Sequence, residues 1–237
     1  MKKKNILLGA IAAIALCVCT LVGATYAWLT DTAVSSNNVV KSGSLTVGVE
    51  YSLDGETWRD LKGADDLFKD IIWEPGYTRV IALRITNKGN VALKYSYGIN
   101  FVGETAGTNK SNEEYKLSQY LNCATAVPQA WNEEGDNTAA TTYLAAMFKR
   151  ENVNSENWLA CTFADLCEGV NSENDLTPGQ AIVTLLQIRM PETVGNEVNA
   201  LTPDDVSEIE MGIKVIATQA SVEEDTFGKD YDEGAQL

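Results

Sequence analysis

The chain has 237 residues, of which 45% are hydrophobic, enough to bury the core of one large domain or of two small ones. Its 33 acidic residues outnumber its 18 basic residues, and a net charge of −15 would repel nucleic acid and anionic membrane surfaces, so we expect no nucleic-acid partner. Histidine is absent, which excludes a Ser/His/Asp triad, a Cys/His pair and an HExxH zinc helix.

Residues 1–27 have the pattern of a secretory signal peptide. Lysines at positions 2–4 precede an uncharged run of apolar and small residues, 6–22. The run is longer than the usual core of a leader and short for a spanning helix, so an uncleaved anchor is the alternative. Small-x-small sites allow cleavage after Ala24 or after Ala27. We expect contact with a membrane only through this leader, before cleavage.

The sequence of residues 28–40 predicts a free β-strand, one without a fixed place in a sheet. They are rich in β-forming side chains, contain no proline and lead into the first clear strand. Cleavage after Ala27 would leave an apolar N-terminus in an exported protein, where water favours polar residues. Such a strand can fold back on its own sheet or add to the sheet of a neighbour. The second arrangement builds an open filament, because a head-to-tail contact that does not close repeats. Its buried side chains would be Trp28, Leu29, Val34, Val39 and Val40.

Alternation of apolar residues with period two dominates the rest of the region 41–220. The alternating segments are 45–51, 81–85, 91–101 and 209–217, and residues 183–190 have the continuous apolar pattern of a buried strand. Asp54-Gly55 indicates a hairpin that returns through Trp58. Half-buried antiparallel strands separated by turns predict a β-sandwich.

A short internal similarity accompanies the strands. Pro75-Gly76 and Pro178-Gly179 each precede a strand with apolar residues at matching positions. One interpretation is that the two strands are equivalent in a plan of two sheets. The other is that Pro-Gly turns commonly precede strands.

Residues 111–168 predict a helical insert between the strands. Ser111 to Glu114 has the form of a capping box, and apolar residues recur at helical spacing from Leu117 to Ala124. A second helix is expected at 143–148 and a third at 158–167, ending at Gly169. We interpret these stripes as packing faces. From residue 221 to 237 the chain is acidic and polar, which predicts a flexible tail.

Three cysteines follow the leader. If Cys161 and Cys167 share one helix, they lie about 9 Å apart, beyond disulfide reach, so Cys123 would have to bridge one of them. An exported protein favours such a bridge, and the alternative is three buried thiols. Without histidine or a CxxC pair we expect no zinc site, and we expect no cofactor.

Carboxylates and aromatic residues are the remaining candidates for a site. A glycosidase needs two suitably spaced acids, but the acids here lie in turns and between helices without a surrounding signature, and solubility is the simpler role. Tyr95 and Tyr97 have the parity of core residues, whereas Trp58, Trp73 and Tyr77 could line a sugar-binding face. The acids concerned are Asp54, Glu56, Asp65, Asp66, Glu133, Glu134 and Asp136.

Two stretches resemble the TasA/camelysin family, exported proteins of Gram-positive bacteria. They are residues 24–32, ATYAWLTDT, and residues 41–47, KSGSLTV, which are similar to the leader and first strand of that family. The similarity extends to the strand after Pro75-Gly76, the turn 87–90 and the closing strands. It implies a jelly-roll sandwich that forms biofilm-matrix fibres, in which the N-terminal strand of one subunit completes the sheet of the next.

The resemblance also implies export through a SipW-type signal peptidase. Cleavage after Thr25-Tyr26-Ala27 would make Trp28 the mature N-terminus, with residues 28–40 as the donor strand. The camelysin branch has been classed as metallopeptidase, and this chain lacks the histidine ligands that such a site normally uses.

We therefore expect a secreted, non-enzymatic structural protein of the biofilm matrix or cell surface. Its fold would be mainly β: a jelly-roll-like antiparallel β-sandwich, residues 41–220, with the helical insert 111–168. Its partners would be further copies of itself in a head-to-tail polymer and other matrix proteins. The alternatives are a surface adhesin or carbohydrate-binding module and, third, a hydrolase that uses two carboxylates.

Overall fold

The computed structural model describes residues 43–69, 71–149, 152 and 156–220. Its main compact unit begins at Leu45 and is mainly β, with antiparallel sheets and few helices. The expected β-sandwich with helices in its middle segment is therefore confirmed. The expected signal peptide (1–27), donor strand (28–40) and acidic tail (221–237) lie outside the described residues.

Two sheets carry the fold. The large sheet has the order β2-β1-β3-β11-β7-β9, with β8 also paired to β11, and the small sheet has the order β10-β4-β12. The chain crosses between the sheets from β3 to β4, from β4 to β7, from β9 to β10 and on both sides of β11, which gives a jelly-roll-like path. The strands of these sheets are β1 (Val47–Ser52), β2 (Arg59–Asp60), β3 (Thr78–Asn87), β4 (Leu93–Thr105), β7 (Asn122–Ala126), β8 (Gln129–Trp131), β9 (Trp158–Cys161), β10 (Val170–Asn171), β11 (Ala181–Arg189) and β12 (Glu208–Gln219).

The remaining elements are short. A two-stranded sheet pairs β5 (Gly107–Thr108) with β6 (Glu114–Tyr115). The helices are α2 (Thr138–Met147), α3 (Phe163–Glu168) and the 3-10 turns η1 (Leu117–Tyr120) and η3 (Asn196–Val198).

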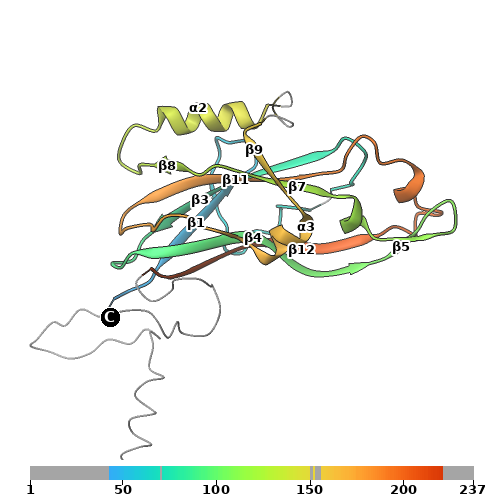
Figure 1. Cartoon of the computed structure of the whole chain (residues 1–237), viewed down its shortest axis with the longest axis horizontal. Coiled ribbons are helices and arrows are strands. Elements are labelled where there is room, and N and C mark those ends of the chain that lie inside the picture. Colours follow the sequence, from blue (N-terminus) through green and yellow to red (C-terminus); the bar gives the residue numbers. More distant parts are fainter. Residues whose placement is uncertain (1–42, 70, 150–151, 153–155, 221–237) are drawn as a thin grey trace, which may run out of the picture. The chain divides into compact units, whose positions relative to one another are not determined.

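The hydrophobic core lies between the two sheets. The central strands β3, β4 and β11 supply Ile85, Ile99 and Ile188, all of which are completely buried. A second cluster lies on the other face of the large sheet, where Leu144 of α2 packs near Val183 of β11. Figure 1 shows α2 outside the large sheet, with the small sheet on the opposite side. Alternate residues of β11 thus face two different apolar layers, which explains its continuous apolar sequence.

All the segments with period-two alternation are strands, as predicted. Segments 91–101 and 209–217 pair with each other as β4 and β12, so that Tyr97 faces Val215 and Ile99 faces Ile213. A hairpin forms around Asp54-Gly55, with β2 pairing back onto β1, but residues 52–58 connect its innermost pair, Tyr51 and Arg59, in place of the two-residue turn that Asp-Gly indicates.

The two Pro-Gly strands lie side by side in one sheet and not in two different sheets, as one of the two interpretations of the sequence had it. The strands β3 and β11 are antiparallel neighbours. Gly76 N donates to Met190 O and Gly179 N donates to Asn87 O, both at 2.9 Å. Each turn therefore starts one strand beside the end of the other, in a locally two-fold arrangement. Both glycines have positive φ, +88° and +78°, which a side chain would strain.

The expected insert contains more strand than the sequence predicted. The first predicted helix is wrong: only η1 forms there, Leu121 has extended backbone, and the chain continues as β7. The third helix begins later than expected, because 158–161 is β9 and only Phe163–Glu168 is helical. The second helix is confirmed as α2. Strand pairing accounts for the difference, since β7 pairs with β11 and β9 pairs with β7. Ladder hydrogen bonds override weak local spacing.

Candidate functional site

One open side of the sandwich forms a groove between β12 and the β1–β2 hairpin. Its volume is about 570 Å³. Among the described strands, β12 pairs with β4 alone, so its other edge has no strand beside it. An edge strand of 12 residues offers a long row of backbone donors and acceptors to another strand. The lining residues are Val47, Gly48, Val49, Glu50, Asp60, Leu61, Lys62, Lys88, Ile213, Lys214 and Val215.

The apolar layer is incomplete on this side. On β4, Tyr97 and Ile99 are 2% and 0% exposed, whereas their partners Val215 and Ile213 on β12 are only half-buried. The facing residue Val49 of β1 is half-buried as well. One further layer of apolar side chains would cover this edge. The core-facing residues of β12 that share this partial exposure are Ile209, Met211, Ile213, Val215 and Ala217.

Three lysines line the groove. The side chain of Lys88 lies so close over Gly48 that a Cβ there would be 2.4 Å from Lys88 Cε. Lys62 is exposed at the end of the hairpin, and Lys214 Nζ donates to the Cys167 carbonyl at the end of α3. Lysines beside a free edge oppose indiscriminate strand pairing. They favour an incoming strand that carries an acid.

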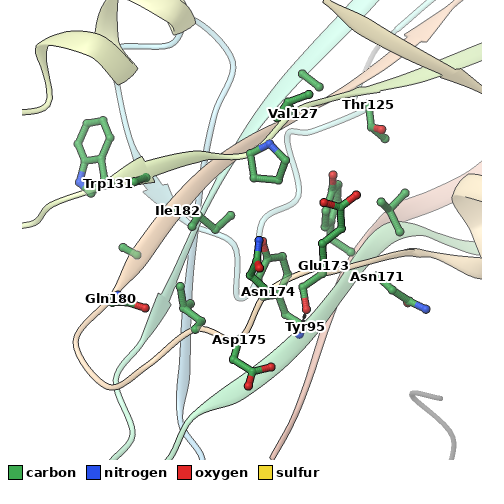
Figure 2. Close-up of a pocket in the computed structure, with 18 of the residues that line it drawn as sticks. Tyr95, Thr125, Val127, Trp131, Asn171, Glu173, Asn174, Asp175, Gln180 and Ile182 are labelled. Carbon is green, nitrogen blue, oxygen red and sulfur yellow. Dashed lines mark hydrogen bonds between the residues drawn. The ribbon is translucent and has the colours of Figure 1, made fainter. Parts of the chain in front are cut away.

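A second opening lies on the opposite side of the sandwich and has different chemistry. This cleft, of about 660 Å³, lies between the segment 170–176 along β4 and the strands β7, β8 and β11 (Figure 2). One lip is apolar, with Val127 and Leu159 51% and 55% exposed. The other lip is polar, and Figure 2 shows Glu173 and Asn174 near Tyr95 while the Trp131 ring points away. Trp131 packs instead in the cluster under α2.

Two tyrosines form the base of this cleft and differ in their hydrogen bonds. Tyr97 Oη is hydrogen-bonded to Thr184 Oγ1 at 3.0 Å, which joins the small sheet to the large sheet. Tyr95 is 4% exposed, and its hydroxyl has no hydrogen-bond partner among the described residues. Burial and the neighbouring Tyr97 raise the pKa of Tyr95 to about 12, so its hydroxyl stays neutral.

The three cysteines lie close together, although not as the sequence suggested. Cys161 is on β9 and Cys167 is on α3, so the shared helix expected for them does not exist. Cys123 of β7 lies directly opposite Cys161, and all three side chains contact the main core. The structure holds them as thiols.

The predicted carboxylate and aromatic candidates do not gather into one site. Asp54 accepts hydrogen bonds within its turn, Asp66 binds Arg59, and Asp136 accepts from Thr138. Trp58 packs near Trp131, with their ring centres 5.9 Å apart. Trp73 contacts Tyr77 at 5.3 Å on the edge of the main core.

Neither of these two openings is recognisable in the sequence. Residues 171–175, Asn-Ser-Glu-Asn-Asp, look like an ordinary polar loop, and only their position along β4 makes them a lip of the cleft. The cleavage residues Thr25, Tyr26, Ala27 and Trp28 and the donor residues Leu29, Val34, Val39 and Val40 fall outside the described part of the chain.

The geometry defines the class of this protein as an antiparallel β-sandwich with two open sides. No model of a known family and no curated protein matches the chain. Within the described residues, no group of three or more Cys, Asp or Glu side chains is arranged to hold a metal ion. No helix in the described ranges has the length and hydropathy needed to span a membrane.

Proposed function

We propose that this protein is a secreted, non-enzymatic subunit of extracellular-matrix fibres, in which residues 28–40 of one copy add to β12 of the next. The observation that carries the proposal is the edge of β12 with which no described strand pairs, together with the half-buried apolar side chains beside it. The leader and the similarity of residues 24–32 and 41–47 to the TasA/camelysin family also support it.

The donor segment suits the groove in length and charge. Residues 28–40 are one residue longer than the 12-residue β12. Asp31 is the segment's one charged residue, and it could lie near Lys62 or Lys88 at the groove. Burial of Leu29 and Val34 would contribute roughly 1.5 to 3 kcal/mol each, before the ladder hydrogen bonds are counted. These contacts would join subunits head to tail without closing a ring.

A comparison of two chain lengths tests the proposal. Chains that begin at Trp28 and at Lys41 are followed by electron microscopy and sedimentation at increasing concentration over days. We expect fibres from the longer chain and monomers from the shorter one. A synthetic peptide of residues 28–40 should bind the shorter chain and should inhibit fibre growth by the longer one.

Two substitutions on β12 distinguish the role of the groove in assembly from that of the outer face of the small sheet. Val215→Lys places a charge in the groove, and Ile216→Lys places the same charge on the next residue, which is 43% exposed on the other face. We expect the first to abolish fibres and the second to leave them intact, with both proteins folded by circular dichroism. Monomers from both chain lengths, or fibres from both, would refute the donor-strand mechanism.

A further inference from the structure

The cleft above Tyr95 has the chemistry of a ligand site, and it lies across the sandwich from the β12 groove. We propose that this cleft binds a neutral or amine-bearing saccharide unit and so attaches the protein to a polysaccharide. The proposal goes beyond self-assembly and does not depend on it, because the cleft is formed by one chain.

The charges of the cleft select against anionic ligands. None of its lining residues is Lys or Arg, whereas Glu173 and Asp175 are exposed on the polar lip. A phosphate, sulfate or carboxylate ligand would meet only like charge there. Asn171, Asn174 and Gln180 add amide groups, which donate to and accept from hydroxyl groups. This lining suits a neutral polyol, and the two acids also tolerate an amine.

The apolar lip and the polar lip of the cleft match the apolar faces and the polar edge of a sugar ring. Val127, Pro128 and Leu159 present exposed apolar surface on one side, and the polar segment 171–175 faces the cleft from the other. A pyranose ring has apolar C–H faces and hydroxyl groups around its edge. The volume of about 660 Å³ falls within the usual range for small-ligand sites.

Tyr95 supplies the hydrogen-bonding group at the base. The residue is 4% exposed, and its hydroxyl, which has no hydrogen-bond partner among the described residues, is not fully shielded from solvent. A hydroxyl that reaches the cleft without a protein partner is available to donate to, or accept from, a ligand hydroxyl. The backbone of this residue is fixed, because Ser172 Oγ accepts from Tyr95 N at 3.0 Å and Ser172 N donates to Tyr95 O at 2.7 Å. The polar lip and the tyrosine are thus held as one unit.

Calorimetric titration of the chain that begins at Lys41 tests the proposal. That chain retains the whole compact unit from Leu45 and lacks the donor segment, so binding is measured without assembly. The probes are maltotetraose and cellotetraose as neutral ligands, a glucosamine tetramer as an amine-bearing ligand, tetragalacturonate as an anionic ligand and tetralysine as a cationic peptide. We expect saturable binding of a neutral or amine-bearing saccharide and none of tetragalacturonate.

Three variants locate the site. Tyr95→Phe keeps the ring and removes the hydroxyl, and Asn174→Ala shortens an exposed residue of the lip. Each should weaken the association constant about three- to tenfold, as expected for the loss of one hydrogen bond. Asp204→Ala, in an exposed turn that does not line the cleft, should bind as the parent does. Absence of saturable saccharide binding, unchanged affinity in both cleft variants, or tighter binding of tetralysine than of every saccharide would overturn the proposal.

Discussion

Cys123 lies directly opposite Cys161 on the antiparallel strands β7 and β9. Residues opposed in this way have Cα atoms about 4.5 to 5.5 Å apart, within the range that a disulfide spans. Cys167 contacts the same core from α3, one residue before the end of that helix. The arrangement of the sheet thus favours Cys161 over Cys167 as the partner of Cys123.

We predict that oxidation forms a Cys123–Cys161 disulfide and leaves Cys167 as a thiol. Peptide mapping under non-reducing conditions identifies the bond, and Cys161→Ser should prevent it. In the reduced protein, burial raises the pKa of Cys123 to about 12, which keeps little thiolate available. Iodoacetamide at neutral pH should therefore modify Cys123 more slowly than Cys167. A bridge between Cys123 and Cys167 would contradict the assignment.

The contact between β4 and α3 requires a glycine at position 98. A Cβ there would lie 2.2 Å from the Leu166 carbonyl oxygen, which is backbone and cannot move aside without displacing α3. We expect Gly98→Ala to lower the free energy of unfolding by about 1 to 3 kcal/mol, measured by urea denaturation. Gly212→Ala on the neighbouring β12 is the control, because no atom lies within 4 Å of its added Cβ. Equal urea midpoints for the two variants would show that α3 does not pack this closely.

Arg84 connects three segments on the outer face of the large sheet. Its Nε donates to Glu50 Oε2 at 2.7 Å, and its guanidinium carbon lies 4.7 Å from the Trp58 ring centre and 5.1 Å from that of Trp131. We expect Arg84→Met, which keeps an apolar stem, to lower the free energy of unfolding by about 1 to 2 kcal/mol and to change tryptophan fluorescence. Arg84→Lys should have an intermediate effect, since it keeps the charge and loses the planar group. No change in either measurement would contradict this role.

The turn at Asp54 should make the fold sensitive to acid. The backbone N–H groups of Thr57 and Glu56 bind the Asp54 carboxylate and hold its pKa well below the usual range. A lowered folded-state pKa contributes stability that is present above the unfolded value, about 3.9, and is lost as the pH falls through the folded value. Asp54→Asn should therefore flatten the dependence of unfolding free energy on pH below about pH 4, as followed by urea titrations. An unchanged slope would contradict this account.

The strands were predictable where each one alternates cleanly along its own length. Tyr95, Tyr97 and Ile99 mark β4 as a strand with one buried face, and the structure buries all three. The strands β7 and β9 were not predictable in this way, because they are short and their residues also fit helical spacing. Their extended conformation depends on pairing with strands distant in the sequence, because β7 pairs with β11 and β9 pairs with β7.

The candidate sites were less predictable than the strands. Residues 1–40 alone show the pattern of a leader and a β-prone segment, but the groove beside β12 needs two edges brought together by the fold. The cleft likewise joins segment 171–175 to Tyr95 and Val127. No local pattern reports such proximity, because it arises from the order of strands in the sheets.

The sequence by itself determined the mainly β class, the positions of the long strands and the lack of histidine chemistry, since composition and alternation are local properties. Only the tertiary structure decided that both Pro-Gly strands share one sheet, that Cys161 faces Cys123 and that β12 is an edge among the described strands. These relations depend on which strands pair, and long-range pairing is set by packing and ladder hydrogen bonds that no single segment contains.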